Sequence, residues 1–226
     1  MPAPSSGSPS PTSTTAGASP AASPTAATPS QASDTATASA GPTLQKGLIP
    51  PASLPAATAE QWAAEGPASN RIVAGHDINE NECATVDGAT AWVQQGYIGG
   101  DGQNSAVQDT FTFADAAAAQ SAFRGVVVGM DGCQQTSRAM QGSNKTPADA
   151  VVLDTATQGQ AEAWKRTWTG VEGLSAAGPQ TNHLYLAVYA NRLIVLQFTE
   201  FPGASAPYNV AADPQVLAML HTELAG

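Results

Sequence analysis

The stretch VQDTFTFADAAAAQSAFRGVVVGMDGC, residues 107–133, predicts a β-strand, an α-helix and a cysteine in direct succession. Residues 115–130 place their apolar side chains three and four positions apart, which is typical of a helix that packs one face against a sheet. Asp115 is a suitable N-cap because its carboxylate can accept hydrogen bonds from the first-turn amides. Asp131-Gly132 is expected to end the helix, since glycine tolerates the backbone conformation of a turn. The apolar stripe consists of Ala116, Ala119, Phe123, Val126, Val127 and Met130.

Cys133 follows this helix, and Cys83 is the only other cysteine in the chain. A bond between the two would tie the end of the helix to the segment before the strand expected at residues 90–98. It would close a loop of about fifty residues, which stabilises a fold by roughly 4 kcal/mol in the chain-entropy model. Paired cysteines are typical of proteins outside the reducing cytosol. The alternative is a cytosolic protein in which both thiols are buried and free.

Composition divides the 226 residues into two parts. Through Pro42, every residue other than Met1, Gln31 and Asp34 is Ala, Gly, Pro, Ser or Thr. Such a segment has too little apolar surface to offset the entropy of ordering, so we expect residues 1–42 to form a disordered stalk. The remaining residues 43–226 have a normal length for one domain with one core.

Charge and hydropathy limit the possible partners and compartments. The formal net charge is −10, and an acidic protein is repelled by phosphates, so we expect no nucleic-acid partner. No apolar run is long enough to span a bilayer, and the amino terminus lacks the basic and apolar regions of a signal peptide. A Ser/Thr/Pro-rich stalk before a two-cysteine domain nevertheless favours export. We therefore expect that a signal peptide was removed, or that a lipid anchor or membrane helix outside this sequence makes any contact with the membrane.

Alternating side chains predict two antiparallel hairpins. Residues 90–98 and 107–113 flank a Gly-rich loop, and residues 183–190 and 192–201 flank a tight turn. Both faces of the second hairpin are largely apolar, which predicts central strands covered on both sides, or one face that forms a ligand cleft. One face holds Leu184, Leu186, Val188, Leu193 and Val195, and the other holds Tyr185, Ala187, Tyr189, Ile194, Leu196 and Phe198.

Further segments complete the expected fold. A Pro-rich lead-in over residues 44–55 is expected to lie on the domain surface, and short strands are expected at 151–153 and 161–170. Asp213-Pro214 has the cap and first-turn residues that open a last helix. Together these elements predict an α+β fold, a single domain in which an antiparallel sheet packs against helices.

No group of residues matches a known catalytic or metal-binding motif. The three histidines are scattered, and no Gly-x-Ser-x-Gly sequence accompanies them. Asp77, Asn79 and Asn81 have the spacing that begins a calcium loop, but the glycine and the glutamate that complete such a loop are missing. We therefore expect no metal, no cofactor and no enzymatic activity. A secreted hydrolase that acts on wall glycans through residues outside any motif is the rival hypothesis.

The strand at residues 161–170 supplies the best candidate for a ligand site. Its alternation places two tryptophans and an arginine on one face, and two tyrosines could line the neighbouring strand. Stacked aromatic rings with a cation suit sugars, glycans or flat anionic ligands. The alternative is that these rings only cover the sheet and that the arginine pairs with Glu162. The candidate residues are Trp164, Arg166, Trp168, Tyr185 and Tyr189.

Several segments, taken in order, resemble the PknH-like extracellular sensor domain family of actinobacterial kinases and lipoproteins. They are the lead-in Leu48-Ile49-Pro50-Pro51 before Trp62, Cys83, the strand WVQQGY at 92–97, the strand FTF at 111–113 with its Ala-rich helix, Cys133, and the late hairpin. The resemblance spans residues 44–226. It implies a twisted antiparallel sheet with packed helices, a cleft for an unidentified ligand, and no enzymatic activity. Kinase members have two disulfides whereas this chain has two cysteines, and no kinase portion is present, which favours the lipoprotein branch.

The function expected from the sequence is therefore a non-enzymatic, envelope-anchored domain that binds a small molecule or an envelope component and acts as a sensor. A secreted enzyme and a structural wall protein are the alternatives. A pocket that contains the aromatic and basic candidates would favour binding. A pocket with two close carboxylates would favour an enzyme, and a domain without a pocket would favour the structural role.

Overall fold

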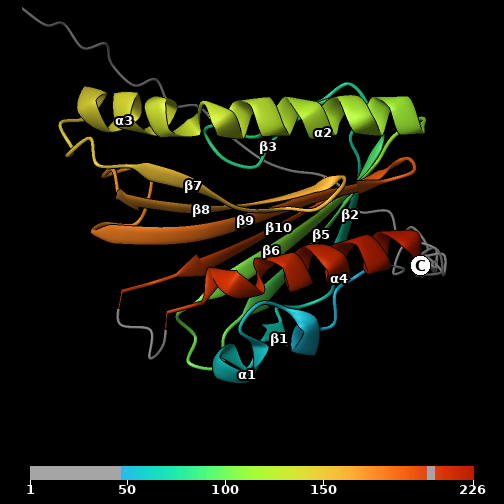
Figure 1. The fold of residues 1–226 in the computed structure, drawn as a ribbon, viewed down its shortest axis with the longest axis horizontal. Helices are drawn as coiled ribbons and strands as arrows, with labels where there is room; N and C mark the ends of the chain where they lie inside the picture. The colour runs from blue at the N-terminus through green and yellow to red at the C-terminus, as the bar shows by residue number, and fades with distance from the viewer. Residues whose placement is uncertain (1–46, 203–206) are drawn as a thin grey trace, which may run out of the picture. The chain divides into compact units, whose positions relative to one another are not determined.

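A computed structural model describes residues 47–202 and 207–226. These residues belong to one compact unit that spans Ala40–Gly226. The stalk predicted for residues 1–42 lies outside the described residues. The fold is α+β, as predicted: an antiparallel sheet packed against helices (Figure 1).

The main sheet has eight strands, all paired antiparallel, in the order β1-β5-β6-β10-β9-β8-β7, and β2 also pairs with β5. A separate two-stranded hairpin consists of β3 and β4. The strands of the main sheet are β1 Ala63–Ala64, β2 Ser69–Ile72, β5 Ala91–Ile98, β6 Ser105–Thr112, β7 Val151–Thr157, β8 Ala161–Thr169, β9 Pro179–Tyr189 and β10 Arg192–Glu200, and those of the hairpin are β3 Ile78–Asn79 and β4 Thr85–Val86.

Helices cover both faces of the main sheet. Figure 1 shows α2 and α3 end to end along one face, with α4 across the other face and α1 beyond it. The helices are α1 Ala57–Glu60, α2 Ala116–Asp131, α3 Cys133–Ser143 and α4 Asp213–Ala225, with 3₁₀ turns η1 Pro51–Ser53 and η2 Val210–Ala212. No helix in the described parts of the chain is both long enough and apolar enough to cross a bilayer.

The helix predicted after residue 113 is present, with two differences. Asp115 is its N-cap and accepts a hydrogen bond from the Ala118 amide at 2.8 Å, as predicted. The predicted end at Asp131-Gly132 is confirmed, with Gly132 as the C-cap, but Gly132 keeps a right-handed conformation and a second helix, α3, begins at the next residue. Ala116 is exposed rather than part of the buried stripe, and Ala122 is buried in addition.

The predicted faces of the late hairpin are confirmed. Leu193 pairs with Val188 and Val195 pairs with Leu186, so the strands keep the expected alternation. A turn at Ala190, in the left-handed conformation with φ of 50°, joins the two strands. Both faces are covered, one by α2 and the other by α4, which confirms the prediction of central strands.

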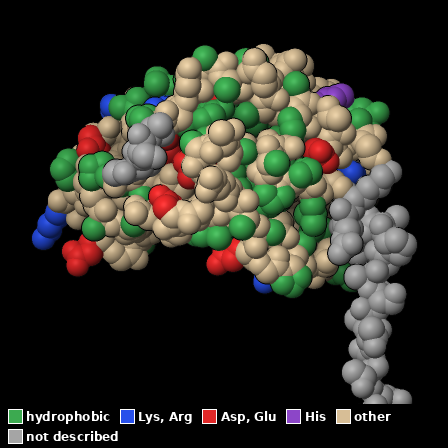
Figure 2. Space-filling view, turned by 90° about the horizontal axis from the view of Figure 1, so that it is seen from below, with side chains coloured by type: hydrophobic (Ala, Val, Ile, Leu, Met, Phe, Trp, Pro, Cys, Tyr) green, Lys and Arg blue, Asp and Glu red, His purple; other side chains and the backbone are tan. Residues whose placement is uncertain are grey.

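The sheet separates two apolar cores. The core on the α2 side contains Phe111, Phe113, Phe123, Val126, Met130, Trp164, Leu184, Leu186, Val188, Leu193 and Val195, with Ala84 and Val86 of the hairpin. The core on the α4 side contains Ile49, Leu54, Trp62, Tyr97, Tyr185, Ile194, Leu196, Phe198, Tyr208, Leu217, Leu220 and Leu224. On the face shown in Figure 2, charged side chains are scattered among uncharged ones and form no continuous basic patch.

The lead-in, residues 47–55, is fastened to the sheet rather than laid on the domain surface. Ile49 is 1% exposed, and its amide donates a hydrogen bond to Gln108 Oε1 at 2.8 Å. Gln108 Nε2 donates to the Gly47 carbonyl at 2.6 Å, and the Tyr97 hydroxyl donates to the Ile49 carbonyl at 2.8 Å. The side chain of Gln108 thus pairs with this segment as a neighbouring strand would.

Candidate functional site

The β3–β4 hairpin lies beside α2, over one end of the sheet (Figure 1). Asn81 forms its turn, because Asn81 Oδ1 accepts hydrogen bonds from the amides of Cys83 and Ala84 at 2.8 and 2.9 Å. Asn79 Oδ1 accepts a hydrogen bond from the Thr85 hydroxyl at 2.8 Å. Two of the three side chains that suggested a calcium loop, Asn79 and Asn81, therefore serve the hairpin itself.

Three anchors hold this hairpin in place. The first is the predicted disulfide between Cys83 and Cys133, whose Cα atoms are 5.3 Å apart. Its approach to α2 requires Gly129, since a Cβ atom at that position would overlap the Cys83 carbonyl oxygen. The other two anchors are the side chains of Glu80, which faces the sheet, and Glu82, which is exposed and contacts Ser137 and Arg166.

Glu82 forms the second anchor. Its Oε1 atom accepts a hydrogen bond from the Ser137 hydroxyl at 2.7 Å and forms an ion pair with Arg166. Arg166 is 4% exposed, and burial lowers its pKa while the charge of Glu82 opposes that change. The ion pair therefore compensates a cation that burial would otherwise make costly.

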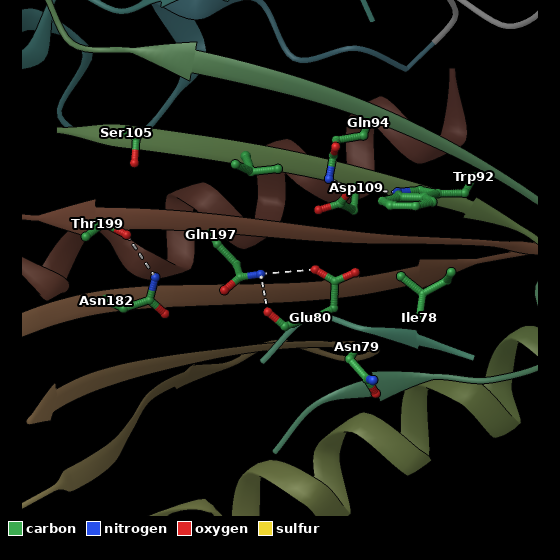
Figure 3. A pocket seen from close by; sticks show the side chains of 11 residues that line it. Ile78, Asn79, Glu80, Trp92, Gln94, Ser105, Asp109, Asn182, Gln197 and Thr199 are labelled. Carbon is green, nitrogen blue, oxygen red and sulfur yellow. Dashed lines mark hydrogen bonds between the residues drawn. The ribbon is translucent and has the colours of Figure 1, made fainter. Parts of the chain in front are cut away.

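Glu80 forms the third anchor and lines an open polar cavity of about 270 Å³ between the hairpin and the sheet. Figure 3 shows Glu80 on the hairpin side facing Asp109, Trp92 and Gln94 on the strands, with Gln197 beside Glu80. Thus β5, β6, β9 and β10 form the floor and the hairpin forms the roof. The lining residues are Ile78, Asn79, Glu80, Trp92, Gln94, Ser105, Val107, Asp109, Asn182, Gln197 and Thr199.

Two acidic side chains meet in this cavity. Asp109 is 2% exposed, and its Oδ1 atom accepts hydrogen bonds from Trp92 Nε1 at 2.6 Å and Gln94 Nε2 at 2.9 Å. Glu80 Oε2 accepts one from Gln197 Nε2 at 3.0 Å. Burial, followed by repulsion from Asp109, raises the pKa of Glu80 to about 9, and burial raises the pKa of Asp109 as well. Each acid thus disfavours the ionisation of the other, and Glu80 is the one that keeps its proton at neutral pH.

Asn182 contributes a spare acceptor to the same cavity. Asn182 is 6% exposed, and its Nδ2 atom donates to the Phe198 carbonyl at 3.3 Å and to Thr199 Oγ1 at 3.4 Å. Its Oδ1 atom is buried and has no hydrogen-bond partner among the described residues. Because buried polar atoms are nearly always paired, this oxygen indicates a place where an additional donor belongs.

The predicted aromatic-basic residues of β8 do share one face, the face that α2 and α3 cover. Trp164 is 1% exposed and belongs to the apolar core, so it does not face solvent. Arg166 pairs with Glu82 of the hairpin rather than with Glu162. The Arg166 guanidinium lies 5.0 Å from the centre of the Trp168 ring.

The two predicted tyrosines lie on the opposite face of the sheet. Tyr185 is fully buried in the α4-side core, and its hydroxyl donates to Asp213 Oδ1 at 3.0 Å. Tyr189 is 42% exposed and its ring contacts His221 edge-on. The structure therefore does not bring the five candidates together in one site. Of the five, Trp168 lines a second pocket, of about 350 Å³, beside α3.

Sequence reasoning missed Glu80, Asp109 and Asn182 as site residues. One signal was present: Asp109 lies between Val107 and Phe111 on one face of its strand, so its neighbours on that face are apolar. A carboxylate at such a position must find buried donors, and it marks either a structural network or a site. The partner from the hairpin carried no comparable signal.

Comparison with known proteins adds a distant similarity. No known protein family matches the sequence, and no curated protein matches it. Among solved structures, the chain is similar to the extracellular domain of PknH from Mycobacterium tuberculosis, with a TM-score of 0.47 and 13% identity, over 73% of this chain and 84% of that one. This similarity does not show membership of the family, so the resemblance found in the sequence stays an expectation.

Proposed function

We propose that the chain is a ligand-binding, sensor-like domain that acts outside the cytoplasm, in the cell envelope, without enzymatic activity of its own. The observation that carries this proposal is the polar cavity under the β3–β4 hairpin, with the unpartnered Asn182 oxygen on its floor. A small hydrogen-bonding molecule is the class of ligand that such a cavity suits.

The disulfide supports the compartment. A bond between Cys83 and Cys133 persists in oxidising surroundings and is rare in the cytosol. Mass measurement after alkylation tests this point: the native chain should take up no alkyl groups until a reductant is added, and then two. Uptake of label by the untreated protein would contradict it. Anchoring through a segment outside this sequence remains part of the proposal.

The arrangement of the hairpin supports the sensor role. A ligand in the cavity would touch Glu80 on the hairpin and Asp109 on the sheet at the same time. Occupancy would therefore change how firmly the hairpin is held, and a ligand shifts a conformational equilibrium when it contacts the two states differently. A partner protein that binds the exposed side of the hairpin would detect such a change.

A secreted enzyme is the second candidate, and the Glu80–Asp109 pair is the observation that favours it. One protonated and one ionised carboxyl group are the usual equipment of acid–base catalysis. Glycoside hydrolysis, however, needs carboxyl groups about 5 Å or more apart, whereas these two are close enough to share a hydrogen bond. Hydrolysis of wall glycans is therefore the weaker hypothesis.

Thermal unfolding of the full chain tests the proposed function. The compounds are wall-glycan fragments, lipids, small amines and small anions. A ligand present at 100 times its dissociation constant stabilises the protein by about 2.7 kcal/mol, which raises the midpoint by roughly 5–10 °C. Asp109→Asn should reduce the shift, and Asp87→Asn, at an exposed position outside the cavity, should not.

Two outcomes would count against the proposal. If no compound class shifts the midpoint, the binding function loses its support. If glycan fragments are cleaved, and cleavage is lost in Glu80→Gln, the enzymatic alternative is correct.

A further inference from the structure

We propose that the pocket beside α3 binds a small uncharged aromatic molecule, with its rings against Trp168 and Leu174 and a hydroxyl or N–H group donating to Glu82. This pocket shares no lining residue with the polar cavity under the hairpin. It is therefore a second binding site, which goes beyond the proposed function and does not depend on it.

Three segments that are distant in the sequence form this pocket of about 350 Å³. They are the turn of the β3–β4 hairpin, one face of α3, and the end of β8 with the loop that follows it. On α3 the contributing residues Ser137, Met140 and Gln141 are three and four positions apart, so they share one face of the helix. The disulfide joins Cys83 of the hairpin to the first residue of α3 and thereby holds two of the three walls together.

Most of the surface inside the pocket is apolar. Met140, Val171 and Trp168 contribute to it, and Leu174 lies on the loop with 63% of its surface exposed. A ligand that covers Leu174 removes apolar surface from water, which favours binding. An accessible pocket with apolar and aromatic walls and few polar groups is typical of a site for a small organic molecule.

Trp168 supplies the aromatic wall. The Arg166 guanidinium lies 5.0 Å from the centre of the Trp168 ring, and Arg166 is itself held by Glu82. The contact between cation and ring restricts the orientation of the indole, which still lines the pocket. A ring held in this way can pack against the rings of a ligand by stacking or edge-on contact.

Glu82 supplies the polar contact. Its Oε1 atom accepts the hydrogen bond from Ser137 and pairs with Arg166, whereas Oε2 has no partner among the described residues. The two bonds to Oε1 restrict the carboxylate, so Oε2 is the atom left for a ligand. A carboxylate oxygen only accepts, so the ligand must bring an O–H or N–H group.

The charges favour an uncharged ligand. Glu82 is the one charged side chain among the described residues that line the pocket, and Arg166 already neutralises it. A ligand carboxylate would meet Glu82 with like charge, and a ligand cation would compete with Arg166 for it. A neutral donor avoids both effects and still forms a hydrogen bond to an ionised acceptor, which is stronger than one between neutral groups.

The volume sets the size of the ring system. An apolar cavity of about 150 Å³ is large enough to bind benzene. A pocket of about 350 Å³ therefore has room for two fused rings with one substituent.

Calorimetric titration of the full chain with three naphthalene derivatives tests the proposal. The probes are 2-naphthol, its methyl ether 2-methoxynaphthalene, which cannot donate a hydrogen bond, and 2-naphthoate, which is an anion. We expect 2-naphthol to bind about tenfold more tightly than the ether, because the ether forms no hydrogen bond with Glu82. Binding of 2-naphthoate should be weaker than that of 2-naphthol, because its charge is repelled by Glu82.

Variants assign the binding to this pocket. Leu174→Ala should weaken 2-naphthol binding by about threefold to tenfold, because apolar contact is lost. Leu153→Ala is the matched control: Leu153 is 54% exposed and lies outside the pocket, so the affinity should not change. Glu82→Gln should reduce the preference for 2-naphthol over the ether. Because Glu82→Gln also breaks the ion pair with Arg166, Leu174→Ala serves alone if that variant does not fold.

Four results would overturn the proposal: no binding of 2-naphthol to the wild type, equal or tighter binding of the ether, tighter binding of 2-naphthoate, or unchanged binding of 2-naphthol to Leu174→Ala. None of them bears on the polar cavity, which the thermal screen with Asp109→Asn tests separately. The two sites can therefore fail or stand independently.

Discussion

Each side of the sheet buries an aspartate, but the surroundings of the two carboxyl groups differ. On the α4 side, Asp213 is fully buried and accepts hydrogen bonds from the hydroxyls of Tyr185 and Tyr208 at 3.0 and 2.9 Å. On the α2 side, Asp109 is also held by two donors but borders an open cavity and a second acid. The first aspartate is sealed in the core, whereas the second lines a cavity.

A single strand shows the origin of this difference. In β10, Ile194, Leu196 and Phe198 face the α4 side and complete its apolar core. On the other face the apolar pattern stops after Val195, because Gln197 and Thr199 follow and line the cavity. Where the pattern is apolar, a helix covers the sheet, and where it turns polar, the β3–β4 hairpin covers it. The cavity therefore lies where the side chains on this face of β10 change from apolar to polar, after Val195.

Removal of the disulfide should have the largest effect, and this effect should fall on the hairpin side of the sheet. Cys83→Ser combined with Cys133→Ser should reduce the free energy of unfolding by roughly 4 kcal/mol, because the unfolded chain regains the freedom of a fifty-residue loop. Urea denaturation measures this loss. Hydrogen exchange should become faster in β3 and β4 while β9 and β10 stay protected. A loss below about 1 kcal/mol, or an equal change in all strands, would contradict the role given to the disulfide.

Two glycines of α2 test how closely the hairpin approaches the helix. Gly129→Ala should destabilise the protein by about 2–3 kcal/mol, because the new methyl group overlaps the Cys83 carbonyl. Gly125→Ala is the matched control: no atom of the described structure lies near that position, so alanine should stabilise the helix by about 0.5–1 kcal/mol. Thermal and urea unfolding of both variants show whether each substitution lowers or raises the free energy of unfolding. Equal effects would show that the close contact is absent in solution.

Loss of one donor should cost more at the sealed aspartate than at the open one. Tyr185→Phe removes a hydroxyl from Asp213 and should destabilise the protein by about 2 kcal/mol, since no water can replace it. Gln94→Leu removes a donor from Asp109 and should cost less than about 1 kcal/mol, because water in the cavity can donate instead. Chemical denaturation compares the two. The reverse order would mean that the cavity is closed to solvent.

The acid pair should leave a signature in the pH dependence of stability. Because the pKa of Glu80 is raised to about 9 from 4.5, the folded chain keeps a proton that the unfolded chain releases. This contribution to stability is complete below pH 4.5 and is lost as the pH rises toward 9, by up to about 1.4 kcal/mol per pH unit. Glu80→Gln should flatten the decline of the unfolding free energy between pH 6 and 9. An unchanged slope in this variant would show that Glu80 is ionised throughout that range.

Much of the fold could be predicted because it depends on local periodicity and on simple counting. The faces of β9 and β10 follow from alternation, and a shift of the turn by one residue leaves these faces unchanged. The disulfide follows from there being two cysteines. The second helix, which begins directly after Gly132, could not be predicted, because residues 134–143 are mostly polar and show no clear apolar stripe.

The site could not be predicted, for two physical reasons. Glu80 and Asp109 are distant in the sequence and meet only because a hairpin with two residues in each strand is fastened over the sheet, and such short strands have no detectable period. The aromatic candidates were placed on the correct face within β8, but grouping them with Tyr185 required the register between β8 and β9. There Tyr185 pairs with Ala163 and not with Trp164, which puts its ring on the far side.

The attachment of the lead-in has a mechanical consequence. Hydrogen bonds of Gln108 and Tyr97 hold residues 47–49 against the sheet, so tension that arrives from the amino-terminal side is carried by the side chains of β5 and β6 before it can unfold any helix. Asp109 follows Gln108 directly along β6 and points to the opposite side. A pull on one side of the sheet therefore strains the very strand that forms the cavity floor on the other.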